Sequence, residues 1–155
     1  MSVETLSTIS PTTNLVVVTR QASSPEEIAR LPREGQEAFK SYRRSHPTLA
    51  SRQEVVTKAL DLLSQRKDVL AKELTEQMGR PIAYTGSEID TAVKRGHYLN
   101  RIAGEVLSED VPGDAEEGFR RFIRREPVGV VLIIFAWNVS QYPTPLLSSI
   151  KIKSC

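Results

Sequence analysis

The stretch VGVVLIIFAWN, Val128–Asn138, places ten apolar residues, glycine included, directly before an asparagine. Apolar and polar positions do not alternate in it, which is the pattern of a strand covered on both faces, as in a parallel sheet. Ligands of such sheets bind beyond the carboxyl ends of the strands, where Asn138 would lie. The stretch therefore predicts an α/β fold and a candidate site at Asn138.

The side chain of Asn138 allows two interpretations. Its amide donates hydrogen bonds without carrying a charge, which suits a group that stabilises a developing oxyanion in a site poor in water. Asparagine also forms Asx turns where a chain leaves a strand, and position alone favours this second interpretation. The position of Asn138 alone thus does not establish a catalytic role.

Two capping sequences mark helices N-terminal to this strand. At Ser24–Glu27, a capping hydroxyl, a proline at the first helical position and a glutamate three residues after the cap predict a helix over 25–44. Ser51–Glu54 repeats the arrangement before a long helix that Gly79 closes. The predicted inner residues are Ile28, Leu31, Ala38, Phe39 and Tyr42 in the first helix, and Val56, Leu60, Leu63, Leu70 and Leu74 in the second.

A third helix is predicted to begin at Thr85–Glu88 and to end at Gly104. Its inner residues are Ile89, Val93, Leu99 and Ile102. Near the N-terminus, Leu15–Arg20 predicts a short strand within an otherwise loose tail. Three amphipathic helices thus precede any substantial sheet.

The segment Phe119–Arg125 predicts an extended and largely exposed strand, because its four arginines leave too few apolar positions for burial. The arginines also raise the hypothesis of a nucleic-acid patch. Phe119 and Phe122 are the aromatic residues around them, and the net charge of the whole chain is only +2. An edge strand protected by charge is therefore the favoured interpretation, and no nucleic-acid partner is expected.

Composition indicates a soluble protein. The 155 residues contain one cysteine, which cannot form an internal disulfide, and residues 1–14 resemble neither a secretory signal nor a transit peptide. The apolar run at Val128–Trp137 is far shorter than the roughly 20 residues that a membrane-spanning helix needs. These observations predict a cytoplasmic protein with no membrane partner and no metal site.

Several separated stretches resemble the NAD(P)-dependent aldehyde dehydrogenases. Residues 126–138, EPVGVVLIIFAWN, resemble the segment that enters the dinucleotide-binding domain of that family, where a strand after EPVGVV ends in a Pro-Trp-Asn turn. Gln77–Pro81 and the following Glu88 and Ile89 resemble the family's N-terminal helical region, in the same order and spacing. The resemblance extends from about Ser24 to Asn138, nearly three quarters of the chain.

The resemblance implies roles for the residues around the end of the strand. Asn138 would be the oxyanion-hole donor that holds the substrate carbonyl oxygen while a cysteine thiolate attacks. The nicotinamide cofactor, NAD or NADP in this family, would be lined by Ile134, Phe135, Ala136 and Trp137. Ala136 departs from the family pattern, which has proline there, and this departure loosens the turn.

The family's remaining machinery has no counterpart that we recognise after Asn138. We find no lysine-containing or glycine-rich cofactor motif, no glutamate base and no Gly-Gln-x-Cys nucleophile. Cys155 is too close in sequence to Asn138 to replace that nucleophile. The sequence therefore predicts a truncated aldehyde dehydrogenase that is inactive by itself.

The predicted organisation has four parts. Residues 1–23 form a flexible tail with a short strand, residues 24–117 a helical region, residues 118–127 an extended arginine-rich arm, and residues 128–155 the first strand of an incomplete, Rossmann-like dinucleotide-binding domain. In the family, the corresponding arm contributes to subunit assembly. An alternative function is therefore that of a non-catalytic partner, which docks on a full-length homologue through Phe119–Arg125.

Overall fold

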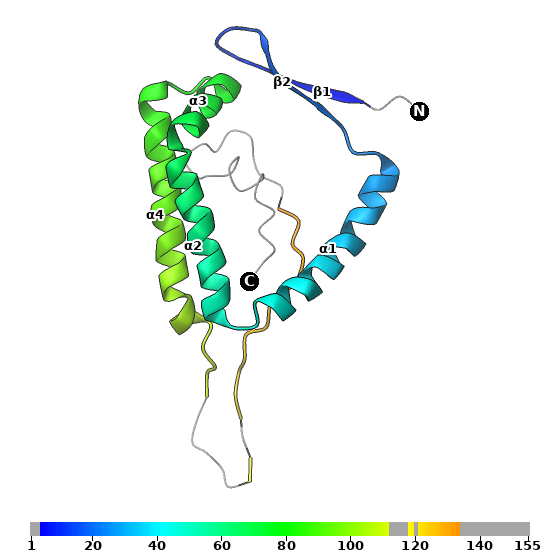
Figure 1. The fold of residues 1–155 in the computed structure, drawn as a ribbon, viewed down its shortest axis with the longest axis vertical. Coiled ribbons are helices and arrows are strands. Elements are labelled where there is room, and N and C mark those ends of the chain that lie inside the picture. The colour runs from blue at the N-terminus through cyan, green and yellow to red at the C-terminus, as the bar shows by residue number, and fades with distance from the viewer. Residues whose placement is uncertain (1–3, 112–117, 120, 134–155) are drawn as a thin grey trace.

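The computed structural model describes residues 4–111, 118–119 and 121–133, and Figure 1 shows their arrangement. Their secondary structure is a two-stranded antiparallel hairpin followed by four helices. The strands are β1 (Thr5–Ile9) and β2 (Val16–Gln21). The helices are α1 (Pro25–Ser45), α2 (Leu49–Gln65), α3 (Lys67–Met78) and α4 (Ile82–Val106).

The hairpin pairs Thr5 with Gln21 and is irregular between Thr8 and Ile9. Ser10 is buried in the turn, where its backbone N–H donates to the carbonyl oxygen of Leu15 at 2.8 Å. The predicted strand at residues 15–20 is therefore confirmed as β2. Its partner β1 was not predicted, because the sequence TLSTI contains too few apolar residues to distinguish it from a polar tail.

Helix α1 begins as its capping sequence predicts. The Ser24 side chain accepts a hydrogen bond from the Glu27 backbone N–H at 3.2 Å, and the Glu27 carboxylate accepts one from the Ser24 N–H at 2.9 Å. These two bonds satisfy N–H groups that have no partner inside the helix. The helix ends at Ser45, one residue beyond the prediction.

The prediction of which α1 side chains are buried is wrong in part. Phe39 is buried, but 59% of Ile28 and 41% of Leu31 are exposed. The physical reason is that α1 stands apart from the other three helices, as Figure 1 shows, so no helix of the described part covers these side chains.

Helix α4 packs against both α2 and α3, and this contact forms the main core. A break at Arg66 divides the predicted long second helix into α2 and α3. The break redirects the chain, and both helices then pack against α4. Helix α2 is capped by Thr48 rather than Ser51. The core is made of Leu60, Leu63, Ala71, Thr85, Ile89 and Ala92.

Helix α4 differs from its prediction at both ends. It begins at Ile82 and ends at Val106, so Thr85 lies inside its first turn instead of capping it. Thr85 is fully buried and its hydroxyl donates to the Ile82 carbonyl oxygen at 3.1 Å. Ile89 is buried as predicted, whereas 60% of Leu99 is exposed, because Asn100 rather than Leu99 faces α2 at this end of α4.

The hairpin turn contacts the turn between α3 and α4. Gly79 ends α3 in the left-handed conformation, with φ of 73°, which confirms the predicted helix stop. A Cβ atom on Gly79 would lie only 2.6 Å from Cγ of Pro11. Glycine is therefore required here both by the backbone angle and by the close approach of the hairpin.

The predicted fold class is only partly confirmed, because the described residues are mostly helical. Over 128–133 no strand is formed, and 84% of Val128 and 83% of Leu132 are exposed. A strand inside a parallel sheet needs a neighbouring strand on each edge, and no described strand lies beside these residues. The described residues of the predicted arm, 118–119 and 121–127, also form no regular strand: Ile123 makes an isolated antiparallel bridge with Asp110. The predicted domain boundaries remain predictions.

Candidate functional site

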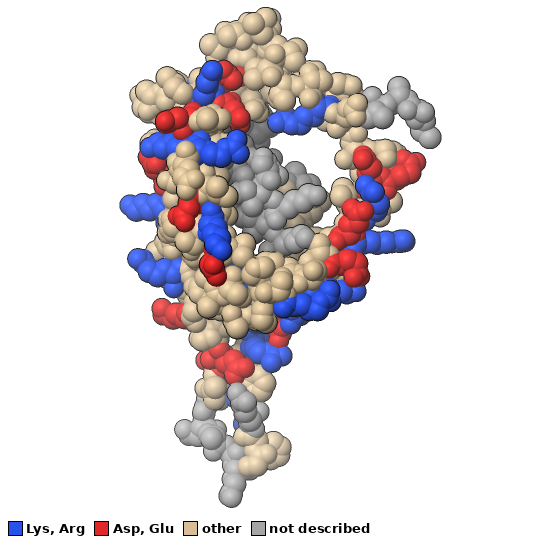
Figure 2. Space-filling view, in the orientation of Figure 1, with Lys and Arg blue, Asp and Glu red and all other residues tan. Residues whose placement is uncertain are grey.

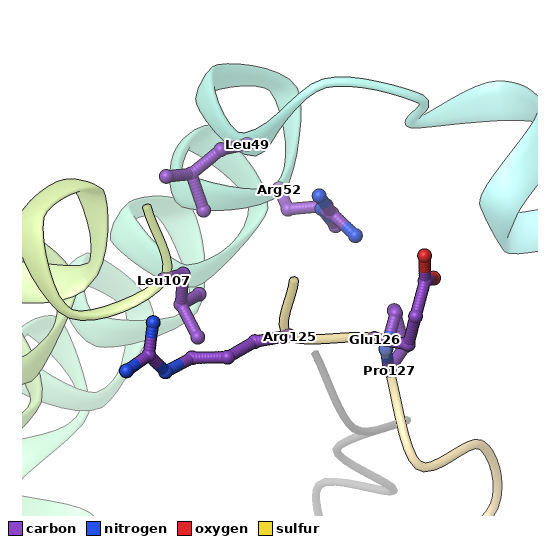
Figure 3. A pocket seen from close by; sticks show the side chains of 6 residues that line it. All are labelled: Leu49, Arg52, Leu107, Arg125, Glu126 and Pro127. Atoms are coloured by element: carbon purple, nitrogen blue, oxygen red, sulfur yellow. The ribbon is translucent and has the colours of Figure 1, made fainter. Parts of the chain in front are cut away.

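A small pocket lies where the chain returns from the arm to the helices. It has a volume of about 140 Å³, and Figure 3 shows the side chains around it. The first residues of α2 form one side, the residue after α4 another, and the segment 125–127 the third. The lining residues are Leu49, Arg52, Leu107, Arg125, Glu126 and Pro127.

Glu126 connects this pocket to α1 and to the arm. Its Oε1 lies 2.5 Å from the guanidinium of Arg124, and its Oε2 lies 3.9 Å from that of Arg43 in the last turn of α1. All three side chains are about half exposed, so each ion pair stabilises the fold only weakly. Arg125 extends away from Glu126, and its Nη1 donates a hydrogen bond to the Ser108 carbonyl oxygen at 2.8 Å.

Beyond the pocket, the chain lies against the apolar side of α1. Gly129 has φ of 101°, a conformation that favours glycine, and a Cβ atom placed on it would be 3.8 Å from the ring of Phe39. Val130 follows, with its Cγ1 3.2 Å from where a Cβ on Gly35 would stand. The two glycines thus allow residues 129 and 130 to approach α1 closely, and this segment leads directly to the predicted site.

The site residues predicted from the sequence, Ile134, Phe135, Ala136, Trp137 and Asn138, lie outside the described residues. Their roles in binding a cofactor and in catalysis therefore stay predictions. Sequence reasoning missed the pocket, because Arg52 and Leu107 are far apart in the chain and the capping sequence that contains Arg52 indicates a helix start, not a pocket.

The arm exposes apolar side chains beside its arginines. The exposed fraction is 71% for Phe119, 42% for Phe122 and 54% for Ile123. Figure 2 shows basic and acidic side chains interspersed over the helices of this face. Within the described residues, no group of three or more His, Cys, Asp or Glu side chains is placed to hold a metal ion. No helix there has both the length and the apolar character needed to span a membrane.

Residues 1–147 match the aldehyde dehydrogenase family, and the chain belongs to this family.

Two relatives are similar over most of this chain. It is 32% identical, over 133 residues, to a probable succinate-semialdehyde dehydrogenase [NADP(+)] from Synechocystis. It is 31% identical, over 135 residues, to a succinate-semialdehyde dehydrogenase [NADP(+)] from Mycobacterium avium. Each match covers 86% of this chain but only 28% of the relative. The chain thus spans little more than a quarter of the length of these relatives.

Solved structures show the same fold. A betaine aldehyde dehydrogenase from Staphylococcus aureus matches 81% of this chain, and 25% of its own, with a TM-score of 0.72 and 21% identity. An NADP-dependent glyceraldehyde-3-phosphate dehydrogenase from Bacillus halodurans matches 81% of this chain, and 27% of its own, with a TM-score of 0.69 and 18% identity. The arrangement of hairpin and helices is therefore that of the corresponding part of aldehyde dehydrogenases.

Proposed function

We propose that this chain provides the N-terminal part of an NAD(P)-dependent aldehyde dehydrogenase, which oxidises an aldehyde to a carboxylic acid. The supporting observation is the family match over 1–147. Because both relatives named above are succinate-semialdehyde dehydrogenases that use NADP, succinate semialdehyde with NADP is the first pair to test.

In this proposal the residues after the pocket act on the substrate carbonyl. The Asn138 amide donates a hydrogen bond to the carbonyl oxygen as negative charge develops on it. Residues 134–137 border the cofactor, which accepts the hydride when it is bound. Glu126, Gly129 and Val130 hold the preceding segment against α1. The 155 residues alone are expected to be inactive, since we recognise no nucleophile motif in them.

A chimera tests this proposal. Residues 1–138 replace the matching segment of the Synechocystis enzyme, and NADP reduction with succinate semialdehyde is followed at saturating substrate. We expect turnover by the chimera and none by the 155-residue chain. Asn138→Ala in the chimera should lower kcat by about 10²- to 10³-fold, the usual effect of losing one oxyanion donor.

The control for the chimera is Asn14→Ala, an amide-to-methyl change in the distant hairpin turn that should leave kcat unchanged. Asn14 has φ of 58°, so this control is accepted only if circular dichroism shows an unchanged helix content. A folded chimera whose kcat is insensitive to Asn138→Ala would refute the oxyanion role. A folded chimera without any turnover would count against the proposed function as a whole.

A second candidate function is supported by the exposed apolar side chains of the arm. Phe119 and Ile123 expose more than half of their surface, and exposed apolar side chains of this kind suit docking on another subunit. We propose that this arm binds a full-length homologue without catalysis. Co-purification with an intact dehydrogenase that survives high salt, and is lost in Phe119→Asp with Ile123→Asp, would support docking. A monodisperse monomer in the same mixture would refute it.

A further inference from the structure

We propose that the pocket beside the start of α2 is an anion site, which accepts a small oxyanion such as a phosphate or carboxylate group. This proposal concerns the described residues only and is independent of the dehydrogenase function. It rests on the positive charge around the pocket, on the buried Nε atom of Arg52 and on the volume of the pocket.

Positive charge exceeds negative charge at this pocket. Arg52 and Arg125 line it, and Arg43 and Arg124 pair with Glu126, which also lines it. Among the six lining residues, two guanidinium groups stand against one carboxylate, which leaves one positive charge in excess.

Arg52 is the group most in need of a partner. Its Nε atom is buried, and no acceptor among the described residues forms a hydrogen bond with it. A buried N–H donor without an acceptor costs free energy, and an anion in the pocket would remove that cost. Figure 3 shows the Arg52 guanidinium pointing from α2 into the space beside Glu126.

The volume of the pocket and the direction of α2 also suit the binding of an anion. A volume of about 140 Å³ is roughly ten times the room that a single water requires. Leu49, which lines the pocket, is the first residue of α2, so the positive end of the helix dipole adds to the attraction of an anion. Leu107 and Pro127 provide apolar walls that exclude part of the competing water.

Inorganic phosphate is the probe for the test, with acetate as a second arm to separate tetrahedral from planar oxyanions. The full 155-residue chain is titrated at constant ionic strength by calorimetry. We expect saturable binding of at least one of the two anions. Arg52→Gln should weaken that binding about tenfold, as expected for loss of a charge-assisted hydrogen bond. Arg52→Lys keeps the charge without the Nε donor and should give an intermediate affinity.

The matched control is Arg33→Gln, which removes the same charge from an exposed position on α1 and should leave affinity unchanged. If Arg52→Gln unfolds, the wild-type chain still decides the question by NMR. Binding should shift the backbone amide signals of Leu49 and Leu107 but not that of Gly79. Absence of saturable binding of both anions, or equal weakening by Arg33→Gln, would overturn the proposal.

Discussion

At the scale of single residues, Gly79 shows how one backbone angle joins two parts of the chain. It ends α3 with φ of 73° and lies against Pro11 of the hairpin turn. An L-residue in this conformation costs about 1–2 kcal/mol before any contact is counted. The hairpin therefore depends on glycine at this position as much as α3 does.

We predict that Gly79→Ala lowers the free energy of unfolding by more than about 1–2 kcal/mol, because the angle is strained and the new Cβ would meet Pro11 at 2.6 Å. Gly104→Ala is the matched control. Gly104 lies within α4, and nothing is within 4 Å of a Cβ placed there. That variant should gain about 0.5–1 kcal/mol from helix propensity. Urea unfolding measures both, and equal effects would contradict the expectation.

We also predict that Ser24→Ala costs about 1 kcal/mol, because the Glu27 N–H loses its acceptor. No other helix packs along α1, so the loss should appear as fraying of its first turn. Ser23→Ala, one residue outside the cap, is the control. Circular dichroism during urea unfolding provides the measurement, and indistinguishable midpoints for the two variants would refute the role of the cap.

The sequence alone predicted the helix stop at Gly79 and the cap at Ser24, because each depends only on residues that are close together in the chain. A capping box needs only residues three apart, and a helix stop needs only one backbone angle. The anion pocket required contacts between α2, the end of α4 and the return segment, and no local pattern encodes such contacts. The roles of residues 134–138 rest on resemblance, since those residues lie outside the described part of the chain.

At the scale of elements, the close contact between α2 and α4 depends on Gly96. A Cβ atom on this residue would lie 2.4 Å from Cδ2 of Leu60, which is itself buried. Beside this contact, the Asn100 side chain donates to the Gln53 carbonyl oxygen at 3.1 Å and to the Thr57 hydroxyl at 3.0 Å. The two helices are thus held by both apolar and polar contacts.

We predict that Gly96→Ala destabilises the protein by about 1–3 kcal/mol through overpacking, despite the better helix propensity of alanine. Leu60→Ala alone should cost about 2–5 kcal/mol by leaving a cavity. Combined, the two changes should cost less than their sum, because the new methyl group partly fills that cavity. A double-mutant cycle measured by urea unfolding checks this, and strict additivity would contradict it.

The order of the helices followed from the sequence, but their breaks and faces did not. Leucines continue at helical spacing across Arg66, so the pattern alone gives one helix where packing on α4 produces two. Likewise, the apolar run at 128–133 predicts a strand only if neighbouring strands are present to pair with it. Ile28 and Leu31 form an apolar face, and the sequence cannot show whether anything covers it.

At the scale of the whole molecule, acid should weaken the fold. The hydrogen bond from Lys40, at 2.8 Å, together with its charge, lowers the pKa of Glu37 below 4.5. The hydrogen bond and charge of Lys58 lower the pKa of Glu54 in the same way, at 2.7 Å. Because these carboxyl groups bind protons more weakly in the folded chain, their stabilising effect is present above pH 4.5 and is lost as the pH falls through the lowered values.

We therefore predict that the free energy of unfolding falls from about pH 6 to about pH 3. Both groups are on the surface, so molar KCl should reduce the fall by screening the lysines. Glu37→Gln with Glu54→Gln should flatten the same part of the curve. Urea unfolding at a series of pH values tests this, and an unchanged slope in the double variant would show that other groups are responsible.

The separation of α1 from the other helices has a consequence for the order in which the chain opens. Helices α2, α3 and α4 pack against one another, whereas α1 is contacted by the short segment at 129–130 and by a weak ion pair with Glu126. Backbone amides in α1 should therefore exchange their hydrogens with solvent through small local openings, and those near Leu60 only when the helices separate. Within the described part of the chain, residues 25–45 would then be the segment that a protease or a chaperone reaches first.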